Sequence, residues 1–157
     1  MATPKSPPAK GADRNDPLPV FCFKVVVQPI GGEAFFKSVG GLRYETETVP
    51  VREGGNNATT YQLVGATKWS NIVLKRGFTR DSGMLTWRES WIGQAGTRAK
   101  TGTITQLNTA LEPEAEWTFY NAFPVKWEIS EFDASKSELA IETLELAHEG
   151  ITYSKKK

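Results

Sequence analysis

The sequence is poor in the residue types that most often carry chemistry. It has a single cysteine, Cys22, and a single histidine, His148. One cysteine can form neither an intramolecular disulfide nor a cysteine metal cluster, and one histidine excludes sites built from several histidines. Cys22 lies in an apolar run, so we expect a buried and unreactive thiol. A nucleophile would need His148 as its base, and His148 lies in a glutamate-rich run near the C-terminus.

The chain also lacks an excess of charge and any long apolar stretch. Lys and Arg total 19 and Asp and Glu total 18, so the formal net charge is +1. This balance gives no general attraction to nucleic acids or acidic membranes. No apolar run approaches the ~20 residues of a membrane-spanning helix, and the N-terminal residues lack the apolar core of a secretory signal. We therefore expect a protein made and assembled in the bacterial cytoplasm, without membrane insertion.

Motifs for cofactors and metals are missing as well. The glycine pairs at 40–41 and 54–55 lack the lysine and the strand-to-helix context of a phosphate-binding loop. Paired acids such as Glu114 and Glu116 could in principle act as in glycoside hydrolases, but their spacing does not show that they face one cleft. A solvated strand face accounts for them better. The sequence predicts no cofactor, no metal and no catalytic residue.

What remains is the composition of one ordinary globular domain. The 157 residues are 39% hydrophobic and 24% charged, which is enough to build a core. We expect residues 1–16, rich in proline and lysine, to be a flexible extension. Residues 17–153 form the predicted domain, and 154–157 form a basic tail.

Most of the domain alternates apolar and polar residues with the period of two that half-buried strands show. Val25 and Val27 share one face of the first run, and Trp117 and Phe119 share one face of a later run. Further candidate strands lie at 72–74, 101–106 and 125–130. The sequence therefore predicts a mainly β fold, a compact sandwich or barrel.

Residues 81–93 break this alternation. Met84, Trp87 and Trp91 recur at the three- and four-residue spacing of a helix, and Gly93 can end a helix in a left-handed conformation. We predict one short amphipathic helix that flanks the sheet. Its tryptophans are better explained as core anchors than as ligand-stacking residues.

Residues 43–64 are predicted to form a long extended hairpin. Its arms are rich in Thr, Glu and Arg and have few large apolar residues, so we expect polar faces. An isolated two-stranded hairpin is marginal in water. It is either covered by another chain or a mobile surface loop, and the residues leave both possibilities open. The tip has turn chemistry and consists of Arg52, Glu53, Gly54, Gly55, Asn56 and Asn57.

Residues 137–149 fit two structures. Ala, Leu and Glu dominate the segment, and their intrinsic propensity favours a helix. Leu139, Ile141 and Thr143 also alternate with polar residues, as in a strand. Local sequence alone does not decide between them.

Five blocks, in order over residues 16–152, resemble the tail tube proteins of contractile phage tails and contractile injection systems. Within that family the chain looks like the branch of conserved phage tail region proteins. The blocks are DPLPVFCFKVVV at 16–27, FFKSVGGLRYETETVPVREG at 35–54, WSNIVLKRG at 69–77, WTFYNAFPVKW at 117–127 and SELAIETLELAHEGI at 137–151.

The resemblance implies a β-sandwich or barrel with one helix, a strand at 137–149 and no catalysis. It implies rings of six subunits that stack into a hollow tube inside a contractile sheath. Implied partners are the sheath, the baseplate tube initiator, terminator or cap proteins, and a DNA or effector cargo in the lumen. The tip residues would then contact neighbouring subunits or rings, with Lys75 and Arg76, or the acids at 112–116, as candidate partners.

Alternatives stay open at this stage. Five tryptophans suggest a β-sandwich that binds carbohydrate, provided that Trp87, Trp91, Trp117 and Trp127 line a concave face. Within the family, the residues do not separate a phage tail from a bacterial injection system. They also do not separate the main tube from a baseplate tube initiator.

Overall fold

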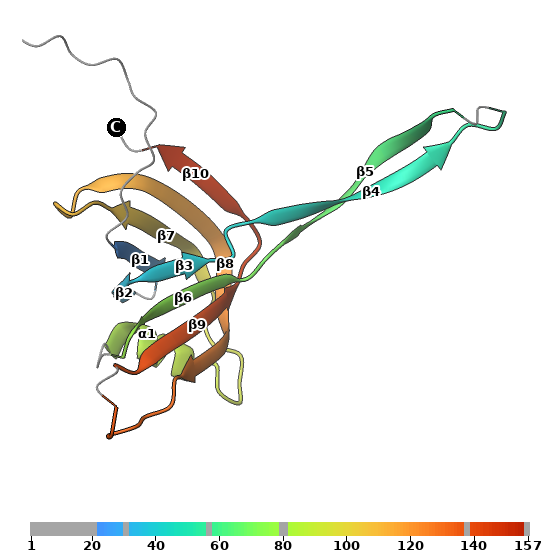
Figure 1. The fold of residues 1–157 in the computed structure, drawn as a ribbon. Helices are drawn as coiled ribbons and strands as arrows, with labels where there is room; N and C mark the ends of the chain where they lie inside the picture. The colour runs from blue at the N-terminus through green and yellow to red at the C-terminus, as the bar shows by residue number, and fades with distance from the viewer. Residues whose placement is uncertain (1–21, 30–31, 56–57, 79–81, 137–138, 156–157) are drawn as a thin grey trace, which may run out of the picture.

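The structure is a computed structural model that describes residues 22–29, 32–55, 58–78, 82–136 and 139–155 (Figure 1). The predicted extension at 1–16 lies outside these residues, and so do Asn56 and Asn57 of the hairpin tip. Of the predicted basic tail, only Ser154 and Lys155 are described, and both belong to a strand.

Strands dominate the described residues, together with one short helix, as the alternation predicts. The strands are β1 Cys22–Gln28, β2 Gly32–Phe36, β3 Ser38–Gly40, β4 Tyr44–Arg52, β5 Thr60–Trp69, β6 Ile72–Gly77, β7 Ala99–Leu107, β8 Pro113–Ile129, β9 Ile141–Ala147 and β10 Ile151–Lys155. The helix α1 spans Ser82–Glu89, within the predicted 81–93, and Gly93 has a positive φ of 73° after its end.

The main sheet closes into a barrel. Its strand order is β2-β1-β7-β8-β9-β6-β3, with every pair antiparallel. The two end strands, β2 and β3, are consecutive in sequence and separated only by Lys37. The Lys37 amide donates to the Lys75 carbonyl of β6 at 2.9 Å, so the residue that joins the two end strands extends the β3–β6 pairing toward β2. Closure leaves few unpaired edges, which are the weak point of an open sheet.

Strand β8 is the long element to which the other strands attach. Its first part pairs with β7 on one side and β10 on the other, and its last part pairs with β9. Phe123 lies opposite Ala147 and Phe119 lies opposite Ile151. Strands β9 and β10 therefore pair with consecutive parts of β8 and keep the same register at these positions. Within the described residues, β10 pairs only with β8, so its second edge is unpaired.

The core contains inward residues from every barrel strand except the three-residue β3. The largest fully buried side chains include Phe36, Trp87 and Phe119. Val25 and Val27 are completely buried, as their alternation predicts. From the helix, Met84 and Trp87 enter the same core, whose buried members are Val25, Val27, Ala34, Phe36, Ile72, Leu74, Met84, Trp87, Ala99, Ile104, Phe119, Ala122, Leu144 and Leu146.

The segment that sequence left undecided, 137–149, contains β9 at Ile141–Ala147. It pairs with β6 on one side and β8 on the other, so its backbone groups are bonded within the sheet. Leu144 and Leu146 face the core. These tertiary hydrogen bonds and contacts override the helix propensity of the local sequence. Residues 137–138 lie outside the described part.

We predict that Gly102→Ala destabilises the barrel by about 1–3 kcal/mol, because overpacking a core forces its neighbours to move. A Cβ at Gly102 would lie 2.1 Å from Cζ of Phe119 in the core. Chemical denaturation of the two proteins measures the difference. Gly77→Ala is the control, because a Cβ there meets nothing within 4 Å. Equal stability of the two variants would contradict the packing described here.

Candidate functional site

The hairpin of β4 and β5 projects away from the barrel and is the most distinctive surface of the molecule (Figure 1). Most of its side chains are exposed along both strands. Arg52, Glu53, Gly54 and Gly55 lie at the exposed tip, and Gly55 has a positive φ of 94°. The predicted hairpin is therefore confirmed, with arms at 44–52 and 60–69.

The distal half of the hairpin has an apolar face, contrary to the polar faces expected from composition. Val49 lies opposite Leu63 and Val51 lies opposite Tyr61. Directly opposed residues share a face, and these four side chains are between 39% and 54% exposed. We call Val49, Val51, Tyr61 and Leu63 the distal apolar face. The expectation of polar faces was wrong because the register of β4 with β5 places the few apolar residues of the distal half on one face.

A β-bulge separates this distal half from the base. Thr46 pairs with Thr67 but Thr48 pairs with Val64, so β5 has one extra residue at this point. Gly65 lies in the bulge, where an added Cβ would come within 2.9 Å of the Glu47 carbonyl oxygen. Bulges increase local twist. The bulge therefore changes the direction of the hairpin between its base and its tip.

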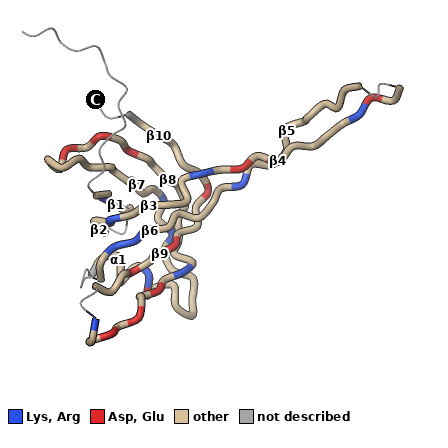
Figure 2. The backbone as a smooth tube through the Cα atoms, in the orientation of Figure 1, with Lys and Arg blue, Asp and Glu red and all other residues tan. Residues whose placement is uncertain are grey.

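The base of the hairpin is held by polar contacts on one side and aromatic contacts on the other. Lys68 forms an ion pair and hydrogen bond with Glu47, and this bond raises the pKa of Lys68. Tyr44 packs against Trp69 at 5.4 Å between ring centroids, and Trp69 packs against His148 at 5.8 Å. Charged residues lie near the two ends of the hairpin and leave its middle uncharged (Figure 2).

The single histidine has a structural place at this base. His148 Nε2 lies 2.8 Å from the carbonyl oxygen of Ser70, which can only accept, so Nε2 carries the hydrogen. The amide of Gly150 donates to Nδ1 at 3.2 Å. Arg43 Nε donates to Ser70 Oγ at 2.9 Å. His148 thus joins the β9–β10 connection to the root of the hairpin.

The two remaining candidate contact residues, Lys75 and Arg76, lie on the barrel in β6, and their environments differ. Lys75 is exposed. Arg76 is only 6% exposed, and its Nε binds Glu142 Oε2 at 3.0 Å. The structure therefore places Arg76 inside the subunit, away from the hairpin tip, and leaves Lys75 as the surface cation of the pair.

Glu142 is the centre of a buried ionic cluster that sequence reasoning missed. Its Oε1 accepts from Arg88 Nη1 at 3.3 Å and from Trp127 Nε1 at 2.7 Å, while Oε2 accepts from Arg76. The guanidinium of Arg88 lies 3.7 Å from the centroid of the Trp127 ring, and that of Arg76 lies 5.0 Å from the Phe36 ring. The cluster joins β6, α1, β8 and β9. Burial lowers the pKa of Arg88.

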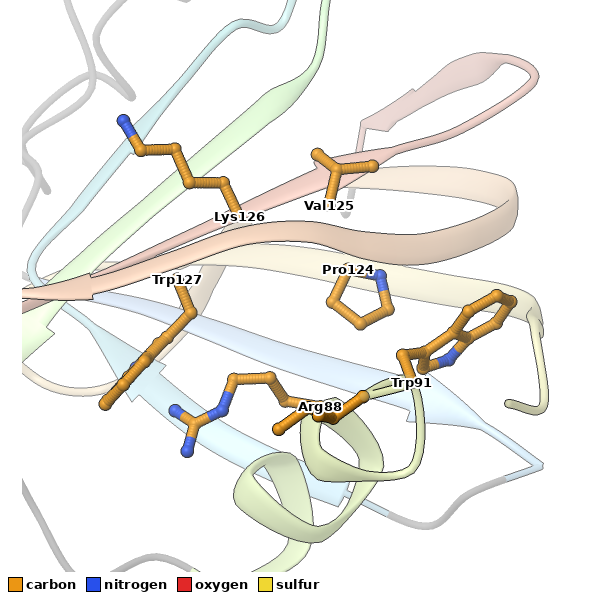
Figure 3. A pocket seen from close by; sticks show the side chains of 7 residues that line it. Arg88, Trp91, Pro124, Val125, Lys126 and Trp127 are labelled. Carbon is orange, nitrogen blue, oxygen red and sulfur yellow. The ribbon is translucent and has the colours of Figure 1, made fainter. Parts of the chain in front are cut away.

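A groove of about 270 Å³ lies beside this cluster, between the end of α1 and β8 (Figure 3). Its lining includes Arg88, Trp91 and Trp127. Trp127 is 38% exposed, but Arg88 stacks on its ring and occupies the face that a sugar would use. Trp91 stacks on Phe123 at 5.3 Å. The groove therefore lacks a free aromatic platform among its described residues.

The other tryptophans also serve packing. Trp87 is 2% exposed and its Nε1 donates to the carbonyl of Thr97 at 2.8 Å. Trp117 packs against the core and against Tyr153. The concave face of exposed tryptophans that carbohydrate binding would require does not form from the described residues. The interpretation of these side chains as core anchors fits the structure.

The paired acids at the start of β8 are held by neighbours within the subunit. Asn108 Nδ2 donates to Glu114 at 2.9 Å, and Thr105 Oγ1 donates to Glu116 at 3.2 Å.

In the part of the chain that the structure describes, no group of three His, Cys, Asp or Glu residues could hold a metal ion. Cys22, the first residue of β1, is partly exposed rather than buried as expected. No helix among the described residues is long and apolar enough to cross a membrane.

A closed barrel with an unsupported hairpin defines a subunit with surfaces suited to contact with other chains. The chain belongs to the family of the T4-like virus tail tube protein gp19, whose model matches residues 19–152. It is thus a structural tube protein, as the five sequence blocks indicate. No curated protein matches the chain significantly.

Solved structures give the same result. A chain of the PVC sheath–tube complex, from an extracellular contractile injection system in the extended state, is 26% identical with a TM-score of 0.76, over 90% of this chain and 93% of that chain. A chain of the six-fold symmetrised anti-feeding prophage baseplate is 25% identical with a TM-score of 0.74, over 99% and 98%. A chain of the PVC sheath/tube terminator is 27% identical with a TM-score of 0.74, over 88% and 97%.

We predict that Glu142→Gln lowers the free energy of unfolding by about 3–5 kcal/mol, because it leaves buried arginines without their counter-charge. Thermal and chemical denaturation measure the loss. Glu128→Gln is the matched control, because Glu128 lies on the surface and contacts only Lys126 at 3.6 Å among the ion pairs described. A loss no larger than that of the control would show that the cluster contributes little to stability.

Proposed function

We propose that the protein is the inner-tube subunit of a contractile injection particle. Six copies close into a ring, and rings stack into a hollow tube that conducts cargo. The match of the tail tube family over residues 19–152 carries this proposal. The similarity to a chain of a six-fold symmetrised baseplate supports the number of subunits per ring. The chain has a building role, without catalysis or a cofactor.

The partners follow from the same relatives. Similar chains occur in a sheath–tube complex, a baseplate and a sheath/tube terminator. We infer that this tube contacts a sheath along its length, a baseplate at one end and a terminator or cap at the other. Two of these relatives belong to an extracellular injection system, which favours an injection particle over a phage tail and an effector protein over DNA as cargo. Assembly takes place in the cytoplasm before any release.

The hairpin is the element through which copies contact one another. Only its base is anchored to the barrel, by Trp69 and His148. The distal apolar face has no cover within the described residues, and a two-stranded hairpin is marginal when it stands alone in water. Burial of this face on a neighbouring subunit would stabilise both the hairpin and the assembly. A contact of this kind joins different surfaces of two copies, as in rings and stacks.

Charges at the tip and on the barrel suit the same contact. Glu53 at the tip and Lys75 on β6 are both exposed, and they lie on different parts of one subunit. Opposite charges on two separate surfaces can meet only between copies. We assign Glu53 to pair with Lys75 of an adjacent subunit, with Arg52 directed to the acids at 112–116.

We predict that Leu63→Asp reduces tube formation by at least about tenfold, because loss of one buried leucine side chain costs about 1.5–3 kcal/mol per contact. Leu63 is 54% exposed in the isolated subunit, so the barrel itself should still fold. Electron microscopy and sedimentation of the purified protein measure assembly, and circular dichroism measures folding.

The matched control for this variant is Val64→Asp. Val64 is the next residue along β5, is 84% exposed and lies on the other face, opposite Thr48. We expect it to assemble nearly as well as the unchanged protein. If Leu63→Asp forms tubes of normal length and number, the distal apolar face is not a subunit contact.

We predict that Glu53→Lys or Lys75→Glu alone shortens the tubes and that the double exchange restores them. Like charges facing each other are unfavourable, and the exchange re-creates an attractive pair. Tube length at low and high salt is the measurement, because screening weakens exposed pairs. If the shortening of the tubes in the double variant equals the sum of the shortenings in the two single variants, Glu53 and Lys75 do not pair directly.

A further inference from the structure

One side of the barrel is unusually rich in hydroxyl groups. Strand β7 turns Gly102 and Ile104 toward the core, so alternate residues of β7 point outward. The neighbouring β8 and β10 continue this outward surface through their register with β7. We call it the hydroxyl face, and its members are Thr101, Thr103, Thr118, Tyr120, Thr152 and Ser154, together with Thr105, which is only 9% exposed.

The hydroxyl groups form continuous rows across the strands. Thr103 lies opposite Thr118, and Thr118 lies opposite Thr152. Tyr120 belongs to the next row, opposite Thr101, and its Oη shares a hydrogen bond with Thr152 Oγ1 at 3.1 Å, which joins the two rows. Three strands therefore contribute to one flat polar surface without an apolar side chain in its middle.

Two charged side chains at the border of this face, Lys24 and Glu116, have partners within the subunit. Lys24 on β1 pairs with Glu33 on β2 at 3.1 Å. Glu116 accepts a hydrogen bond from Thr105 at 3.2 Å. An apolar groove of about 390 Å³ borders the face on the β1 side, where Val26 lies opposite Thr103 and Phe35 and Leu111 are exposed. The hydroxyl rows of β7, β8 and β10 themselves contain neither an apolar patch nor a strong field of one sign.

The bulk of the subunit lies on the opposite side of these strands. Strands β6 and β9 and helix α1 contribute Leu74, Leu144 and Trp87 to the same core that receives Ile104 and Phe119. These elements therefore cover the inner side of β7 and β8, and no other described strand or helix covers the outer side of these two strands (Figure 1).

The unpaired edge of β10 shows how this surface can continue from one copy to the next. Residues 151–155 pair only with β8 in the described part of the chain. An unpaired strand edge is a template for pairing with another chain. In a ring that continues sheets side by side, bulky layers fit on the outer side, where the circumference is larger. The uncovered face of each sheet is then directed toward the axis.

We propose that the hydroxyl face lines the bore of the tube and is the surface past which cargo moves. This inference rests on the proposed function. The hydroxyl rows offer weak, exchangeable hydrogen bonds and no concentrated charge. Such a wall does not hold a passing macromolecule, and its lack of one-sign charge gives no counterion-release attraction to a polyanion.

The test is cysteine accessibility in assembled tubes. Thr103→Cys and Thr118→Cys are made separately in a Cys22→Ser background, so that each protein has one thiol. Tubes and dissociated subunits are treated with a small maleimide or with a maleimide on a polyethylene glycol chain too wide for the bore. Ala95→Cys, in the exposed loop between α1 and β7, is the control.

We expect the small reagent to modify both sites in tubes and the wide reagent to react at least about tenfold more slowly in tubes than in subunits, because thiol reactivity follows access. Reaction of the wide reagent at equal rates in tubes and subunits would place the face outside. Protection from both reagents would bury it in a subunit contact. Micrographs without rings or tubes would instead contradict the proposed function itself.

Discussion

Closure of the sheet through Lys37 is the constraint on which the remaining surfaces depend. A single residue separates β2 from β3, and its amide bonds to the Lys75 carbonyl of β6. Because closure satisfies most strand edges, the barrel has little need for further chains to complete it. The edges and faces that stay uncovered, the hairpin and β10, are those available for assembly.

The ionic cluster around Glu142 reinforces the same barrel from inside. One carboxylate receives two arginines and an indole N–H, and these groups come from three different elements. A buried charge of this kind is costly unless all partners are present. The helix is therefore fixed against β8 and β9, and Trp127 is covered by Arg88 instead of being open to a ligand.

Much of the fold could be predicted from residue patterns. The alternation around Val25 and Phe119 identified buried strand faces, and the spacing of Met84 and Trp87 identified the helix. Residues 141–147 could not be assigned from local sequence, because propensity and pairing favour different structures there. Of the candidate contact residues, Arg52, Glu53, Gly54 and Gly55 lie on an exposed hairpin, and their contact role stays a prediction. The burial of Arg76 depends on Glu142, 66 residues away.

The sequence by itself determined the class of the protein: a mainly β chain in a family recognised from ordered blocks. Only the tertiary structure decided which side chains share a surface. The register of β4 with β5 gathers Val49 and Leu63 on one face, and the register of β7 with β8 aligns Thr103 with Thr118. Register is set by the turn and by the hydrogen bonds between two paired strands, so the alternation within either strand alone does not contain it.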